Sequence, residues 1–127
     1  MKAIMIVDDE FIILESLRMQ INRIIGPDVI LETASSAEEA CREIAAIASK
    51  GIDLRIVISD FNLDDGKGTE VLTFALNLYP GMRKVILSGQ SDNKMISEFD
   101  EKYGLDAFIG KPWNFDEIDR LVHRAID

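Results

Sequence analysis

Acidic residues, a hydroxyl and a lysine stand directly after apolar segments of the chain. Asp8 and Asp9 follow the first such segment, Asp60 the third, Ser88 the fourth and Lys111 the fifth. Carboxylates brought into one pocket repel one another: two unit charges about 4 Å apart interact by roughly 4 kcal/mol at an effective dielectric of ~20. Such a cluster either takes up a proton or holds a cation.

The types of these residues indicate phosphoryl chemistry. A few oxygen ligands open to water suit Mg²⁺, which keeps several waters and takes carboxylates together with phosphate oxygens. Lys111, as a point charge, and Ser88, as a hydrogen-bond donor, would complete a clamp for an anion. A metal, a lysine, a hydroxyl and a spare carboxylate in one place predict transfer of a phosphoryl group onto that carboxylate.

Short apolar runs rich in Val and Ile must position these side chains. The runs do not alternate with polar residues, which is typical of strands buried on both faces of a parallel sheet. Glycines and prolines fall between the apolar segments rather than inside them. The runs cover residues 3–7, 29–31, 54–58, 85–87 and 107–109.

Helical patterns follow each run. Ser36 and Glu39 form a capping box that opens the second helix, and Asn114 caps the fifth. The third helix ends at Tyr79, and a weaker fourth helix covers residues 93–103. Five strand–helix units predict a doubly wound α/β fold with a five-stranded parallel sheet and helices on both faces. In such folds the functional crevice lies at the carboxyl ends of the strands, where the polar residues would meet.

Length and charge narrow the class of protein. The 127 residues fit one domain, residues 1–127. With 14 Lys and Arg against 23 Asp and Glu, the net charge is −9, which argues against direct binding to nucleic acid or anionic membranes. Cys41 stands alone, so an internal disulfide and a cysteine-based metal cluster are excluded. No segment has the pattern of a signal peptide or a membrane span, and we expect a cytoplasmic protein.

The order of the polar residues resembles the receiver domain of two-component response regulators. The matching positions are Asp8-Asp9, Asp60, Ser88 and Lys111-Pro112, and the resemblance covers the whole chain. It implies a flavodoxin-like, CheY-like (βα)5 fold, Mg²⁺ as the cofactor and a phosphorelay signalling role. It implies no enzyme in the usual sense, but self-catalysed phosphoryl transfer and autodephosphorylation.

The resemblance also implies roles for individual residues. Asp60 matches the phosphoacceptor, which becomes a phosphoaspartate. Asp8 and Asp9 match the acidic pair that holds Mg²⁺ together with Asp60, and the backbone carbonyl of Asn62 matches a further metal ligand.

Further matches concern the response to phosphorylation. Ser88 matches the residue that moves to bond the phosphoryl group, and Lys111 the lysine that pairs with it. Phe108 matches an aromatic switch that turns into the space Ser88 vacates. The Lys111–Pro112 bond would be cis. The implied donor is a histidine kinase or a histidine phosphotransfer protein. A homodimer or an effector would bind through the face of the fourth helix, fifth strand and fifth helix.

The loop after Asp60 departs from the family's common pattern. Residues 62–68 read NLDDGKG, without the usual Pro-Gly pair and with two extra acids. We expect these acids to add negative field near the site and to shift its metal affinity. Asn62 and Gln90, each two residues past a site residue, are candidate tuners of the phosphoryl lifetime.

Three other kinds of protein share part of this pattern. A phosphatase of the haloacid-dehalogenase type needs a second Asp two residues after the nucleophile as a general acid, and Asn62 stands there. A flavin-binding domain of the same topology needs a phosphate loop after the first strand, where Asp8, Asp9 and Glu10 would repel a phosphate. A phosphorylation-independent interaction module of receiver fold remains open.

Overall fold

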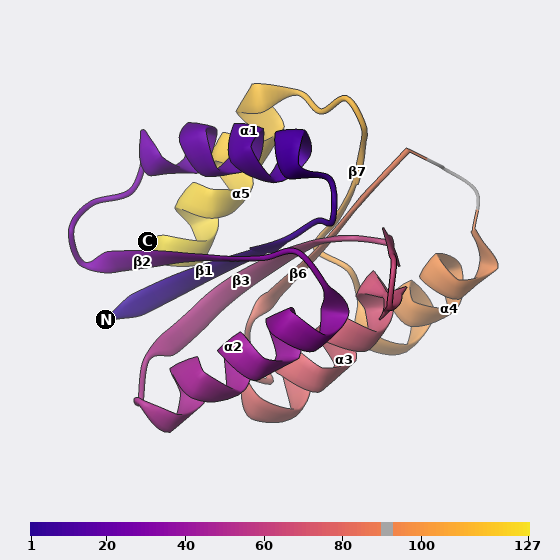
Figure 1. The fold of residues 1–127 in the computed structure, drawn as a ribbon, viewed down its shortest axis with the longest axis horizontal. Coiled ribbons are helices and arrows are strands. Elements are labelled where there is room, and N and C mark those ends of the chain that lie inside the picture. Colours follow the sequence, from indigo (N-terminus) through magenta and orange to yellow (C-terminus); the bar gives the residue numbers. More distant parts are fainter. Residues whose placement is uncertain (90–92) are drawn as a thin grey trace.

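A parallel five-stranded sheet forms the centre of the computed structural model, which describes residues 1–89 and 93–127. The strand order is β2-β1-β3-β6-β7 (Figure 1). This confirms the predicted doubly wound, flavodoxin-like architecture. The strands are β1 (Lys2–Val7), β2 (Val29–Ala34), β3 (Asp53–Asp60), β6 (Arg83–Ser88) and β7 (Ala107–Gly110).

Helices cover both faces of this sheet (Figure 1). Because successive strand side chains point to opposite faces, β1 sends Ala3, Met5 and Val7 to one hydrophobic layer and Ile4 and Ile6 to the other. Helices α2, α3 and α4 close the first layer, and α1 and α5 close the second. The helices are α1 (Phe11–Asn22), α2 (Ala37–Ser49), α3 (Gly68–Leu78), α4 (Lys94–Tyr103) and α5 (Phe115–Ile126).

The predicted helix starts are present, with polar side chains accepting the unpaired N–H groups. Ser36 Oγ accepts from Glu39 N at 3.0 Å, and Asn114 Oδ1 accepts from Asp116 N at 2.8 Å. Such caps are worth about 1 kcal/mol each. Within the described residues, no helix combines the length and apolar character needed to cross a bilayer.

Two features differ from the predicted elements. The strands extend past the apolar runs, because ladder hydrogen bonds use the backbone whatever the side chain; Asp60 and Ser88 are therefore the last residues of β3 and β6. Second, the loop after Asp60 folds into a small antiparallel hairpin of β4 (Asn62–Leu63) and β5 (Gly66–Lys67). Its two-residue turn is Asp64-Asp65, and Gly66 already belongs to β5, so this hairpin lacks the Asn-Gly or Asp-Gly turn that signals a hairpin most strongly.

A buried glutamine joins α1 to α5. The Nε2 atom of Gln20 donates to Phe115 O at 2.9 Å and to Asp119 Oδ1 at 2.8 Å. Its Oε1 atom accepts from the indole Nε1 of Trp113 at 2.9 Å. Both polar groups of the side chain are thereby hydrogen-bonded, as a buried amide requires. The segment that leads from β7 into α5 is thus fixed to α1.

Candidate phosphoryl-acceptor site

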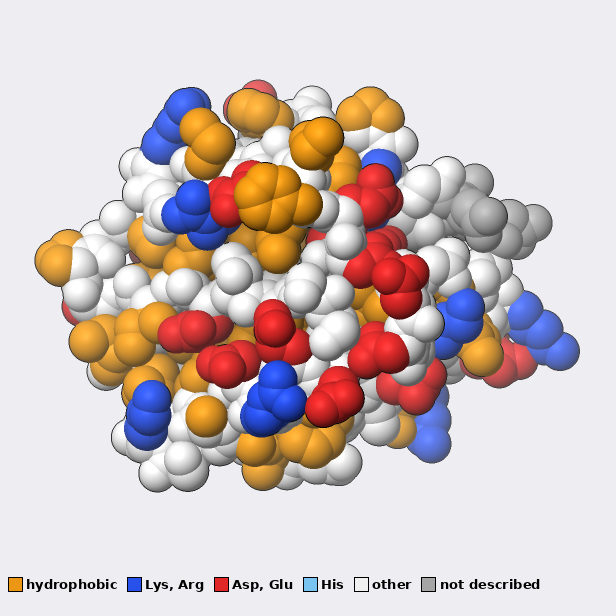
Figure 2. All heavy atoms as spheres, viewed as in Figure 1, with side chains coloured by type: hydrophobic (Ala, Val, Ile, Leu, Met, Phe, Trp, Pro, Cys, Tyr) orange, Lys and Arg blue, Asp and Glu red, His pale blue; other side chains and the backbone are white. Residues whose placement is uncertain are grey.

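Three carboxylates meet at the carboxyl edge of the sheet. Asp8 and Asp9 follow β1, and Asp60 ends the neighbouring strand β3, so the strand pairing itself brings them together. One oxygen from each lies within 4.8 Å of the others. Asp8 is 0% exposed and Asp60 6%. Figure 2 shows acidic side chains gathered over this end of the molecule.

Lys111 supplies a positive charge to this cluster. Its Nζ atom lies 2.8 Å from Asp8 Oδ2, 3.4 Å from Asp60 Oδ1 and 3.5 Å from Glu10 Oε1. The lysine follows β7, and its backbone N–H donates to Ser88 O at 3.0 Å, which holds the segment against β6. The Lys111–Pro112 bond is cis, as the resemblance implies.

The negative charges of the carboxylates in this cluster are not fully compensated by Lys111 alone. Burial raises the pKa of Asp60 to about 6; the charge of Asp8 adds to the rise, and Lys111 opposes it. Burial alone would lower the pKa of Lys111, but close contact with Asp8 and the charges of Asp60 and Glu10 outweigh it, so the pKa lies above its usual value. The ammonium thus stays charged, yet it does not compensate fully for the carboxylates.

The residues present fit a hard divalent cation such as Mg²⁺. Asp8 Oδ1 accepts from Glu10 N at 2.9 Å. Among the described residues, its buried Oδ2 accepts no well-aligned hydrogen bond and makes only the ion pair with Lys111. The Lys111 ammonium, 2.8 Å away, is already a cationic partner of this oxygen, but one ammonium faces the three carboxylates of the cluster, and a further cation would balance their charge. The oxygen-only donor set agrees with the preference of Mg²⁺.

The other predicted residues occupy neighbouring positions. Ser88 is buried at the end of β6, where its neighbour Leu87 pairs with Asp60 on β3. Phe108 is half-buried on β7 and lines a cavity of about 330 Å³ together with Ile96 and other residues of the α4 segment. Gln90 lies outside the described residues.

The β4–β5 hairpin is held closed beside Asp60. Gly68 N donates to Phe61 O at 2.7 Å. Lys67 Nζ donates to the side-chain Oδ1 of Asn62 at 2.7 Å and lies 5.3 Å from the centre of the Phe61 ring. Asn62, whose carbonyl is the predicted metal ligand, is thus the first residue of a compact two-stranded unit.

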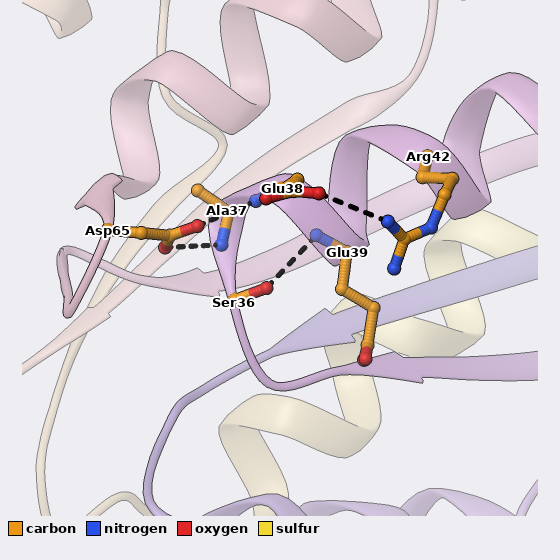
Figure 3. Close-up of polar contacts among 6 residues, drawn as sticks. All are labelled: Ser36, Ala37, Glu38, Glu39, Arg42 and Asp65. Carbon is orange, nitrogen blue, oxygen red and sulfur yellow. Dashed lines mark hydrogen bonds and ion pairs between the residues drawn. The ribbon is translucent and has the colours of Figure 1, made fainter.

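The two extra acids of this hairpin take different directions. A hydrogen bond with Asp9 and the charge of Asp9 raise the pKa of Asp64, which places this acid beside a carboxylate of the site. The carboxylate of Asp65 instead accepts hydrogen bonds from the first turn of α2 (Figure 3). Hydrogen bonds from the backbone of Glu38 and Ala37 hold the pKa of Asp65 below its usual value, and its charge still raises the pKa of Asp64. The shift in metal affinity expected from the two acids stays a prediction.

A glycine next to Asp60 has no room for a side chain. A Cβ atom at Gly68 would lie 2.2 Å from the backbone oxygen of Asp60. We expect Gly68→Ala to lower the free energy of unfolding by about 3 kcal/mol, because the backbone of Asp60 must shift. Urea unfolding measures this change.

Gly81→Ala is the control for this prediction, because a Cβ atom at Gly81 meets nothing within 4 Å. Its unfolding free energy should change by less than about 0.5 kcal/mol. Equal stability of the two variants would contradict the close packing of Gly68 on Asp60.

Two residues of the site received no individual role from the sequence: Glu10, which contacts Lys111, and Gly68, which packs on the backbone of Asp60. Glu10 could have been found, since it extends the acidic run after the first strand. Gly68 depends on a contact between segments, as does the contact of Asp65 with α2.

Comparison with known proteins identifies the family. A family model described as the response regulator receiver domain matches residues 4–123. The chain belongs to this family. Receiver domains of response regulators are signalling modules of two-component systems, and they generally bind Mg²⁺ at an acidic pocket of the kind formed by Asp8, Asp9 and Asp60. A search of curated proteins by sequence found no match.

Solved structures of receiver domains are similar over nearly the whole chain. A CheY-like receiver domain protein from Methanospirillum hungatei JF-1 is 30% identical, with a TM-score of 0.79, covering 98% of this chain and 92% of that one. The receiver domain of an HD domain-containing protein from Pseudomonas fluorescens Pf-5 is 25% identical, with a TM-score of 0.82 and coverage of 98% and 94%. Chemotaxis protein CheY4 of Vibrio cholerae, 18% identical with a TM-score of 0.77 and 99% coverage of both chains, shares the fold.

Proposed function

We propose that residues 1–127 act as one receiver unit that accepts a phosphoryl group on Asp60. The donor is a phosphohistidine on a histidine kinase or phosphotransfer protein, and the reaction depends on Mg²⁺. The observation that carries this proposal is the position of the Asp60 carboxylate, buried beside Asp8, Asp9 and the Lys111 ammonium. A carboxylate among these groups has a charged clamp for the incoming phosphoryl oxygens.

The proposed step is an in-line displacement at phosphorus. An oxygen of ionised Asp60 forms the new P–O bond while the P–N bond to the donor imidazole breaks. The imidazole nitrogen leaves with the electron pair and takes a proton from water. Mg²⁺, when bound by Asp8, Asp9, Asp60 and the carbonyl of Asn62, would supply positive charge against the phosphoryl oxygens. Lys111 keeps Asp60 in its nucleophilic, ionised form and then pairs with the phosphoryl group.

The phosphoaspartate is then hydrolysed at the same site by water. The protein thus catalyses its own phosphorylation and dephosphorylation and does not turn over a separate substrate. Asn62 is a candidate for tuning this step. Its side-chain oxygen is held by Lys67 Nζ at 2.7 Å, which fixes the direction in which the amide points.

A donor protein has to rest on the surface around Asp60 to bring its phosphohistidine within bonding distance. Phe11 and Ile12, at the start of α1, are 73% and 77% exposed and follow directly after Glu10 of the site. Phe115 is exposed at the start of α5. Exposed apolar side chains next to a charged site favour a protein donor over a small molecule.

The proposed output is a change on the face formed by α4, β7 and α5. The new dianion would draw Ser88 and Lys111 inward. Phe108 would then turn toward the space that Ser88 leaves. The cavity of about 330 Å³ beside Phe108, between α4 and β7, supports this movement because the ring is not packed on all sides. A homodimer or a downstream effector would bind the altered face.

Intact-mass measurement after incubation with acetyl phosphate tests the proposal. We expect the native protein to gain one phosphoryl group with Mg²⁺, to gain none in EDTA, and Asp60→Asn to gain none in either condition. Asp53→Asn, at the exposed start of the same strand, should behave like the native protein. Absence of the adduct on a native protein that binds Mg²⁺ by calorimetry would favour the phosphorylation-independent interaction module instead.

A further inference from the structure

The carboxylate of Asp65 bridges two elements that the sequence keeps far apart. Its Oδ1 accepts from Ala37 N at 2.8 Å and its Oδ2 from Glu38 N at 3.0 Å. Asp65 lies in the turn of the β4–β5 hairpin, whereas Ala37 and Glu38 open α2. Figure 3 shows the carboxylate pointing at the start of this helix.

This contact completes the N-terminus of α2. The first N–H groups of a helix have no partner within the helix. Ser36 satisfies Glu39 N through its side chain at 3.0 Å, and its backbone oxygen accepts from Ala40 N at 3.0 Å. Asp65 takes the two groups that remain, and its negative charge lies at the positive end of the helix dipole. The hairpin therefore supplies the hydrogen-bond acceptors for two of the four N–H groups in the first turn of α2.

Backbone pairing connects the two ends of the hairpin. Asn62 pairs with Lys67 and Leu63 pairs with Gly66, and Gly68 N closes the base on Phe61 O. At the turn, a Cβ atom on Gly66 would lie 3.4 Å from the Cβ atom of Ala37, so the hairpin already rests on the helix. One end of this unit carries the carbonyl of Asn62 and the other end carries Asp65.

We infer that Asp65 is a positioning residue, which holds the Asn62 carbonyl in place for the cation by anchoring the hairpin to the N-terminus of α2. The inference rests on the proposed role of that carbonyl as a metal ligand. Coupling between two sites is reciprocal. Cation binding at the carboxyl edge of the sheet therefore also steadies the first turn of α2, a helix on the opposite side of α3 from the α4–β7–α5 face.

Two substitutions on the same helix end separate this role from simple helix capping. Asp65→Ala and Ser36→Ala each remove a cap from α2, but only Asp65 belongs to the hairpin. We expect Asp65→Ala to weaken Mg²⁺ binding, measured by calorimetry, by about tenfold, the loss typical of groups that orient metal ligands. Ser36→Ala should keep the native affinity to within about twofold. Equal affinities of Asp65→Ala and the native protein, or an equal loss in Ser36→Ala, would overturn the inference.

A second measurement reads the coupling from the helix. Hydrogen exchange of the Ala37 and Glu38 amides should slow when Mg²⁺ is added to the native protein. In Asp65→Asn, Mg²⁺ should not change the exchange of these amides. This variant has nearly the native side-chain size and can be used if Asp65→Ala does not fold. Unchanged exchange at these two amides in a native protein that binds Mg²⁺ would also overturn the inference. Neither measurement uses phosphorylation. A native protein that binds Mg²⁺ but takes no phosphoryl group would refute the proposed function, and the positioning role of Asp65 could still be tested.

Discussion

Asp60→Asn is expected to be more stable than the native protein at neutral pH without divalent cations, by about 3 kcal/mol. The pKa of Asp60 is raised from 3.8 to about 6 in the folded state, chiefly by burial. Between these values the folded state binds more protons than the unfolded state, so stability falls as the pH rises through this window. The difference between the two pKa values corresponds to about 3 kcal/mol of folding stability, which the native protein loses when Asp60 ionises. The Asp60→Asn variant carries a neutral amide there and does not lose it.

Urea unfolding in EDTA across this pH range measures the effect. The two proteins should be equally stable below about pH 4, where the carboxyl is protonated in both states, and should separate by pH 7. Addition of Mg²⁺ should stabilise the native protein more than Asp60→Asn, because the charged carboxylate is one of the proposed ligands. Asp53→Asn removes an acid from the exposed start of β3 and should change little. A native protein as stable as Asp60→Asn at neutral pH would contradict the raised pKa.

Lys111→Met should produce the opposite result, a loss of about 3 kcal/mol in the free energy of unfolding without metal. The ammonium is 14% exposed and contacts Asp8, which is fully buried. Removal of one partner of a buried ion pair leaves an uncompensated charge, which typically costs about 3–5 kcal/mol. Mg²⁺ should restore part of the loss, since a cation would then supply the missing charge. Phosphorylation by acetyl phosphate should become much slower.

Lys84→Met is the matched control. Lys84 is similarly buried, at 12% exposure, and its Nζ lies 3.5 Å from Asp106, a carboxylate that water reaches. A pair of this kind contributes about 0–1 kcal/mol, and Mg²⁺ should have no effect on the variant. Similar losses for both lysines, or no rescue of Lys111→Met by Mg²⁺, would contradict the special position of Lys111.

The positions of Asp8, Asp60 and Lys111 could be predicted because a simple rule applies to them. Each follows or ends a strand of a parallel sheet, and such ends meet at one edge. The sheet could be predicted from the hydrophobic runs, because strands that are buried on both faces appear in the sequence as continuous apolar segments. The limits of β3 and β6 were less predictable, since backbone pairing continues through polar residues such as Asp60 and Ser88.

The environment of Asp65 could not be predicted in the same way. Its partners, Ala37 and Glu38, stand 28 and 27 residues earlier in the chain, and nothing in the loop itself indicates them. The requirement for glycine at residue 68 likewise depends on how closely the hairpin returns to the backbone of Asp60. These contacts are decided by the packing of segments against one another, whereas the site's residue types are visible in the sequence.

The joint between α1 and α5 gives the protein an optical probe of its own. Trp113 is the single tryptophan of the chain, and it stands two residues after Lys111. Its indole N–H is held by Gln20, and its ring lies 6.4 Å from that of Phe115. All tryptophan emission therefore comes from one ring, which is held by Gln20 and stands two residues along the chain from the lysine of the site. Its intensity should follow cation and phosphoryl binding in real time, without any attached dye.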